Sequence, residues 1–179
     1  MTTSLQARPG SATERKPTSI KWTIGILIFL GVTALGGGIE MLVFYQGNEY
    51  LPVDMLERIP FDTYIVPGLV LGIGFGLGSL FVAWGMWRRP EIGWLGWLES
   101  LTERHWAWAG SVLIGLGFTM WMVIEVSLLG APWAPENAGG GEPIAWVLYS
   151  VYGATALLLL ILPQLRPVRS YMRGADPSR

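Results

Sequence analysis

Residues 65–87 read IVPGLVLGIGFGLGSLFVAWGMW, a run of 23 residues without a charged side chain. An α-helix rises about 1.5 Å per residue, so a run of this length crosses a hydrocarbon core of ~30 Å. Within lipid every backbone N–H and C=O must be hydrogen-bonded, which permits only helices or closed barrels. The run lacks the apolar–polar alternation of a barrel strand. It therefore predicts a transmembrane helix.

Three further apolar runs extend this interpretation to the whole chain, at residues 22–44, 106–129 and 144–162. The first is longer than the apolar region of a signal peptide, about 7–15 residues, so we expect a retained span. The sequence thus predicts an all-α polytopic membrane protein, a four-transmembrane-helix bundle in one domain over 21–163. A disordered polar tail over 1–20 and a basic C-terminal tail over 164–179 are expected to flank it.

The composition supports a membrane protein and excludes several functions. Hydrophobic residues make up 51% of the chain and charged residues only 14%, whereas a soluble domain carries about 25% charged residues. Cysteine is absent, which removes disulfides, thiol redox chemistry and cysteine metal sites. The net charge of −1 gives no general attraction to nucleic acid. Because no metal motif or phosphate loop is present, we expect no metal, no cofactor and no nucleic-acid partner.

The basic residues predict how the chain is oriented. Those expected on one side of the membrane are Arg8, Arg15, Lys16, Lys21, Arg88, Arg89, Arg104, Arg166, Arg169, Arg173 and Arg179. The two opposite loops hold only Arg58 and are acidic. Because cytoplasmic loops carry the excess of Lys and Arg, we expect a multi-pass protein of the cell (plasma) membrane with both termini in the cytoplasm.

Two shorter segments between the spans are expected to be helical. One lies on the cytoplasmic side, where apolar residues recur on one helical face: Trp94, Trp97, Leu98 and Leu101. This pattern is typical of a helix lying in the membrane interface, with an anchoring role. The other is a short surface helix between Pro52 and Pro60. His105 is the single histidine and is interpreted as an interfacial residue, because it has no partners for a metal site.

Glycines predict how the first two spans pack. Gly68, Gly72 and Gly76 are spaced by four residues in the second span, which puts small residues on one helix face and lets another backbone approach closely. The expected partner face lies on the first span at Gly36 and Gly37. These glycines lie inside a span rather than between a strand and a helix, which excludes a dinucleotide-binding loop.

Two intramembrane carboxylates are the strongest candidates for a functional site. Glu40 and Glu125 each lie four residues before the expected end of their span. Both spans run in the same direction, so both acids are expected roughly 6 Å inside the outer surface. Intramembrane acids usually face the bundle interior or a wet cavity, and Phe118 and Trp121 add an aromatic setting suited to an organic cation. Three interpretations stay open: rim residues that reach the headgroups, a cation- or proton-binding site, and a catalytic pair.

The stretch PFDTYIVPGLVLGIGFGLGSL (residues 60–80), followed by HWAWAGSVLIGLGFTMWMVIEV (residues 105–126), resembles a group of small, functionally uncharacterised bacterial four-span membrane proteins. The shared features are Phe61, Asp62 and Tyr64 at the entry, then a Pro67-Gly68 pair that opens a Gly-rich helix. The resemblance covers about residues 60–162. It implies the fold and the topology and adds no activity.

Three classes of function follow. The favoured one is a non-catalytic membrane or envelope component that acts through protein or lipid contacts. The alternative is a small transporter or proton/cation-coupled carrier that uses Glu40 and Glu125. A weaker alternative is an intramembrane lipid-modifying enzyme in which the two acids serve as acid and base. The expected partners are the lipid bilayer and either another membrane protein or a second copy of the chain.

Overall fold

The computed structural model describes residues 16–48, 51, 53–129 and 143–173. Within these ranges the chain forms helices and no strand. Four helical segments are long and apolar enough to cross a membrane: Thr18–Val43, Ile65–Arg88, Trp106–Leu129 and Trp146–Gln164. The predicted all-α fold with four apolar spans is confirmed, and the architecture is that of a multi-pass membrane protein.

The four spans differ in their internal construction. The first and third are single helices, α1 (Thr18–Val43) and α5 (Trp106–Leu129). The second is continuous but has three parts, α2 (Ile65–Leu69), η2 (Val70–Leu77) and α3 (Gly78–Arg88), of which η2 is a π-helix. The fourth joins α6 (Pro143–Ile161) to the short η4 (Leu162–Gln164). The π-helix was not expected, because hydropathy carries no signal for it.

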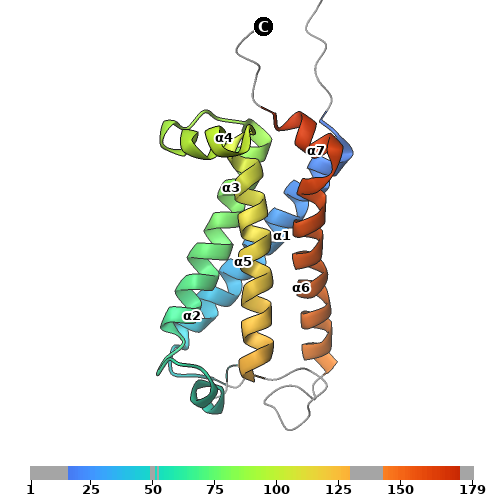
Figure 1. The fold of residues 1–179 in the computed structure, drawn as a ribbon. Coiled ribbons are helices and arrows are strands. Elements are labelled where there is room, and N and C mark those ends of the chain that lie inside the picture. Colours follow the sequence, from blue (N-terminus) through green and yellow to red (C-terminus); the bar gives the residue numbers. More distant parts are fainter. Residues whose placement is uncertain (1–15, 49–50, 52, 130–142, 174–179) are drawn as a thin grey trace, which may run out of the picture.

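Short helices lie at both ends of the bundle (Figure 1). η1 (Val53–Arg58) occupies the position of the surface helix expected between Pro52 and Pro60. At the opposite end, η3 (Gly93–Leu95) and α4 (Gly96–Thr102) lie across the bundle, and α7 (Arg166–Tyr171) follows η4. We call this second end the basic end because it carries Lys16, Lys21, Arg88, Arg89, Arg104, Arg166, Arg169 and Arg173. The other is the acidic end, with Glu40, Glu57, Asp62 and Glu125.

Part of the expected C-terminal tail belongs to the folded domain. Val168 and Met172 are fully buried, and the backbone N–H of His105 donates to the carbonyl of Met172 at 2.8 Å. The domain therefore extends past residue 163, because α7 has apolar side chains to bury. The expected N-terminal tail, residues 1–20, lies mostly outside the described residues, and α1 begins at Thr18.

The order of the spans around the bundle decides which side chains can meet. α1 packs against α2, η2 and α3 on one side and against α6 on the other, while α5 packs against α3 and α6. α1 and α5 therefore occupy opposite corners of a four-helix arrangement. The core begins with a stripe on α1 at three- and four-residue steps: Ile20, Ile24, Leu27, Leu30 and Ala34.

Glycines bring α1 into close contact with the second span. A Cβ added to Gly38 would lie 2.6 Å from the Cα of Gly72, and one added to Gly68 would lie 3.1 Å from the carbonyl oxygen of Gly38. A Cβ on Gly76 would lie 3.1 Å from the backbone nitrogen of Leu35. Real Cβ atoms essentially never approach another atom as closely as 2.6 Å, and 3.1 Å is tighter than most real Cβ contacts. The close approach of the two helices therefore depends on glycine, above all at Gly38.

The α1 side of this contact differs from the expected one. Gly36 is exposed, and a Cβ added to it would meet no atom within 4 Å. A Cβ on Gly37 would reach only the side chain of Leu71, at 3.1 Å. Gly38 is the contact residue instead, because it continues the buried stripe of α1 four residues after Ala34. The prediction of Gly36 as a packing residue was wrong, because α1 is rotated so that Gly36 points away from the second span.

Candidate functional site

The basic end presents an amphipathic surface formed by η3 and α4. Trp94, Trp97 and Leu101 are 72%, 58% and 72% exposed, whereas Leu95 is buried and Leu98 packs against the core. Three of the four residues expected on one apolar face thus point outward, and Leu98 holds the segment to the bundle. Exposed tryptophans beside a helical bundle are typical of the membrane interface.

Hydrogen bonds at the start of α5 position α4. The backbone N–H of Trp106 donates to Oε1 of Glu99 at 3.1 Å, so a carboxylate from α4 caps the N-terminus of α5. The indole Nε1 of Trp106 donates to the carbonyl of Pro90 at 2.9 Å. The Trp106 ring also lies against Gly85 of α3, where an added Cβ would overlap it. Trp106 therefore ties the start of α5 to α4 through Glu99 and to the end of α3 through Gly85 and Pro90.

His105 belongs to the same junction and is buried, with 8% of its surface exposed. Its Nδ1 accepts the backbone N–H of Ala107 at 3.3 Å, which makes Nε2 the protonated nitrogen that donates to the carbonyl of Pro90 at 3.1 Å. Burial lowers the pKa of His105 and outweighs the opposing effects of the hydrogen bond to Pro90 and the charge of Glu99; the charge of Arg89 makes a smaller lowering contribution. His105, which the sequence placed at the membrane interface, is therefore a neutral side chain that helps to join α3, α5 and α7.

Arginines from three segments gather beside the start of α5, where the backbone of Arg104 pairs with that of Arg173. Partial burial lowers the pKa of Arg104, and the neighbouring charges of Arg169 and Arg173 lower it further. The Nε of Arg104 is buried without a hydrogen-bond partner. Its guanidinium lies 4.6 Å from the ring centroid of Trp108, and Nη2 of Arg89 donates to the carbonyl of Arg173 at 3.3 Å. We call Arg104, Arg169 and Arg173 the arginine cluster.

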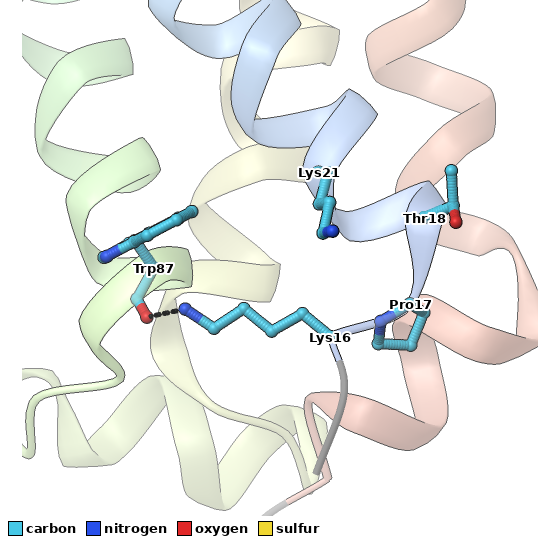
Figure 2. Close-up of a pocket in the computed structure, with 5 residues that line it drawn as sticks. All are labelled: Lys16, Pro17, Thr18, Lys21 and Trp87. Carbon is cyan, nitrogen blue, oxygen red and sulfur yellow. Dashed lines mark hydrogen bonds between the residues drawn. The ribbon is translucent and has the colours of Figure 1, made fainter. Parts of the chain in front are cut away.

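A lysine from the start of α1 completes the basic end (Figure 2). Nζ of Lys16 donates to the carbonyl of Trp87 at 2.8 Å and lies 3.8 Å from the centroid of that indole ring. A cation on the last carbonyls of α3 is favoured by the negative end of the helix dipole. Lys21 and Thr18 line the same open groove.

The acidic end contains the second candidate site, a cavity of about 100 Å³ beside Glu125. It is closed by α5 through Trp121 and Glu125, by Met41 of α1, and by Phe61 and Tyr64, which precede α2. Trp121 donates a side-chain hydrogen bond to the carboxyl group of Glu125 one turn later. The sequence did not predict that Phe61 and Tyr64 line a cavity, although their pattern indicated the entry of the second span.

The expected site residues separate into three places. Glu125 and Trp121 line the cavity, but Glu40 does not, and the adjacent Met41 does so instead. Phe118 lies deeper in the bundle, buried against Phe75 and Tyr152 with ring centroids 5.3 and 6.0 Å apart. The two acids do not share this cavity: α1 reaches it through Met41, whereas the preceding Glu40 does not line it.

Among the described residues no group of three or more His, Asp or Glu side chains is placed to hold a metal ion. The basic end offers cations and exposed indoles, while the cavity offers one carboxyl group in aromatic surroundings. Comparison with protein-family models, curated proteins and solved structures finds no match to this chain.

Proposed function

We propose that this chain is a non-catalytic component of the cell membrane that binds anionic phospholipid headgroups at its basic end. In this proposal the basic end faces the cytoplasm, and both termini lie there. Of the basic residues that the structure describes, only Arg58 lies at the acidic end, and an excess of Lys and Arg marks the cytoplasmic side. The anionic inner leaflet then supplies the partner.

The arginine cluster is the observation that carries the proposal. The charges of Arg169 and Arg173 lie close enough to lower the pKa of Arg104, so like charges gather here, and arginine remains charged at every physiological pH. Among the described residues, the charge of Glu103 opposes this lowering of the Arg104 pKa. A phosphate headgroup would supply the missing negative charge and acceptors for free guanidinium N–H groups.

The surroundings suit a lipid rather than a soluble anion. Trp94, Trp97 and Leu101 are exposed on the neighbouring η3–α4 segment, where they would insert at headgroup depth and hold the cluster at the membrane surface. Each basic residue near an anionic surface contributes about 1 kcal/mol, and the attraction is screened within a Debye length. The binding should therefore weaken with salt.

The test compares lipids and charge variants on the full chain in zwitterionic short-chain phosphatidylcholine micelles. Adding short-chain phosphatidylglycerol should raise the melting temperature of the wild type, and 0.5 M salt should reduce the gain. The double variant Arg169→Gln/Arg173→Gln, whose residues are both exposed, should lose most of it.

Two single variants serve as controls. Arg166→Gln removes an exposed charge from the same helix outside the cluster, and Arg58→Gln removes one from the acidic end; both should keep most of the gain. Equal losses per charge removed in all three variants would reduce the effect to net charge and contradict a specific cluster. An unchanged gain in the double variant would overturn the proposal.

The two other function classes draw on Glu40 and Glu125 as a pair. A carrier or an acid–base enzyme that needs both carboxyl groups at one point has no support in the cavity, which Glu40 does not line. Glu125 does line the cavity and can act there without Glu40. An additional membrane-protein partner, or a second copy of the chain, stays a prediction.

A further inference from the structure

We propose that the cavity beside Glu125 binds an ammonium group, carried either by a lipid headgroup or by a small free amine. This site lies at the acidic end, and its function is independent of the lipid contact proposed for the basic end. Four features support this site: the carboxyl group of Glu125, the aromatic walls of the cavity, its size and its depth.

The carboxyl group of Glu125 is only partly satisfied. The side chain is partly buried and receives a hydrogen bond from Trp121, but a carboxylate has about four acceptor positions. Among the described residues no Lys, Arg or His forms an ion pair with it. A carboxylate in apolar surroundings is costly unless a cation or further donors complete it. An ammonium group supplies both the charge and the donors.

Aromatic side chains form much of the cavity wall. Trp121, Phe61 and Tyr64 line it together with apolar side chains such as Met41 and Ile59. Aromatic faces attract cations, and quaternary ammonium groups are commonly held in this kind of enclosure. A neutral apolar ligand would leave the Glu125 carboxylate unpaired, so the combination of one acid with several rings favours an organic cation.

The size of the cavity limits the ligand. Sites for drug-sized molecules enclose about 300–1,000 Å³, whereas this cavity holds about 100 Å³. It can admit a tetramethylammonium-like or ethanolamine-like group and is too small to enclose a large multidrug-type cation. A ligand longer than this must leave its remaining part outside, as a phospholipid would.

The depth of the cavity agrees with both sources of the ammonium group. Glu125 lies one turn before Leu129, the last residue of α5, which corresponds to about 6 Å along the helix axis. The cavity is therefore close to the headgroup region on the acidic side. Amine headgroups reach this level, and so do free amines from the adjoining solution.

The experiment measures binding by isothermal titration to the full chain in a non-ionic sugar detergent. The probes are tetramethylammonium and ethanolamine, with neutral 3,3-dimethylbutanol as a control of similar bulk. We expect the wild type to bind at least one of the ammonium probes at least tenfold more tightly than the neutral control. Mass spectrometry of the protein purified from mixed vesicles then tests retention of phosphatidylethanolamine over phosphatidylglycerol.

Matched variants locate the site. Glu125→Gln keeps the shape of the side chain and should weaken ammonium binding at least tenfold. Glu40→Gln removes a carboxylate at a similar depth that does not line the cavity, so its binding should equal that of the wild type. Trp121→Phe keeps an aromatic ring but loses the N–H donor, and it provides a second test of the site if Glu125→Gln folds poorly; an altered ammonium affinity is expected.

The outcomes separate the two sources and decide the proposal. Binding of free ammonium probes that depends on Glu125 supports a site for soluble amines. Retention of phosphatidylethanolamine that depends on Glu125, without binding of the free probes, supports a headgroup site. Equal binding of ammonium and neutral probes, equal affinity in Glu125→Gln, or neither binding nor lipid retention would overturn the proposal.

Discussion

His105 shows how one side chain can join three elements at the basic end. Its ring bonds to Pro90 after α3, its backbone N–H bonds to Met172 after α7, and it directly precedes α5. A neutral imidazole fits because Nδ1 accepts a hydrogen bond from the backbone N–H of Ala107. Protonation of Nδ1 would place its new N–H donor against the backbone N–H donor of Ala107. The junction should therefore be sensitive to acid.

The pH dependence follows from the direction of the pKa shift. The pKa of His105 is lowered in the folded state, so the unfolded chain binds more protons below its own pKa of about 6.5. The stabilisation is fully present above that value and falls as the pH drops from it toward the lowered pKa, by at most about 1.4 kcal/mol per pH unit. Denaturant unfolding in micelles between pH 7.5 and 5 measures it.

His105→Gln provides the control for this measurement. Glutamine keeps an N–H donor toward Pro90 but does not titrate, so the free energy of unfolding should depend less on pH than in the wild type. The acidic residues contribute equally to both proteins, and the difference between the two curves isolates the histidine. Parallel curves would show that His105 does not contribute to the loss of stability at acidic pH.

At the scale of elements, the contact between α1 and the second span depends on glycine backbone. Gly38 and Gly72 face each other where α1 meets η2, and Gly68 and Gly76 extend the contact on either side. The second span is a π-helix here, with i→i+5 hydrogen bonds that rotate side chains away from their α-helical positions. Which glycines face α1 therefore depends on this local geometry as well as on spacing.

Gly38→Ala should destabilise the protein, whereas Gly36→Ala should not. Both replacements gain helix propensity of up to about 1 kcal/mol, but the new methyl group at Gly38 would lie 2.6 Å from backbone atoms of Gly72. Overpacking of this kind costs about 1–3 kcal/mol. Thermal unfolding of both variants in the same micelles gives the comparison, and equal melting temperatures would show that the helices do not meet at Gly38.

At the scale of the whole molecule, charge divides the bundle into two chemically different ends. The basic end combines the arginine cluster with exposed indoles, and the acidic end combines Glu125 with a small aromatic cavity. The apolar helices between them expose many large side chains, including Ile73, Leu113 and Leu157, as expected for surfaces in contact with lipid. In the proposed orientation the basic end faces the cytoplasm and the anionic inner leaflet, and the acidic end faces the outside of the cell.

Cysteine labelling tests that orientation directly, because the chain has no cysteine of its own. In intact cells, Asn48→Cys at the acidic end should react with an impermeant thiol reagent added outside. Ser170→Cys, on an exposed position of α7, should react only after the membrane is opened. The reverse pattern would place the basic end outside the cell and contradict the proposed contact with the inner leaflet.

The sequence by itself determined the features that depend on local composition. Hydropathy and length located the four spans, including residues 65–87, because the energy of placing a helix in lipid is largely a sum over its own residues. The division of charge between the two ends followed from the same spans. The segment 93–102 was also evident, since its pattern of tryptophan and leucine is local.

Only the tertiary structure decided which residues meet. The rotation of α1 places Gly38, and not Gly36, at the contact with Gly72. Likewise Met41, and not the adjacent Glu40, lines the cavity beside Glu125. The same is true of His105 and the arginine cluster, which depend on α7 returning to the start of α5. These contacts arise from packing between segments distant in sequence, and neither spacing nor hydropathy within one segment determines the rotation and neighbours of its helix.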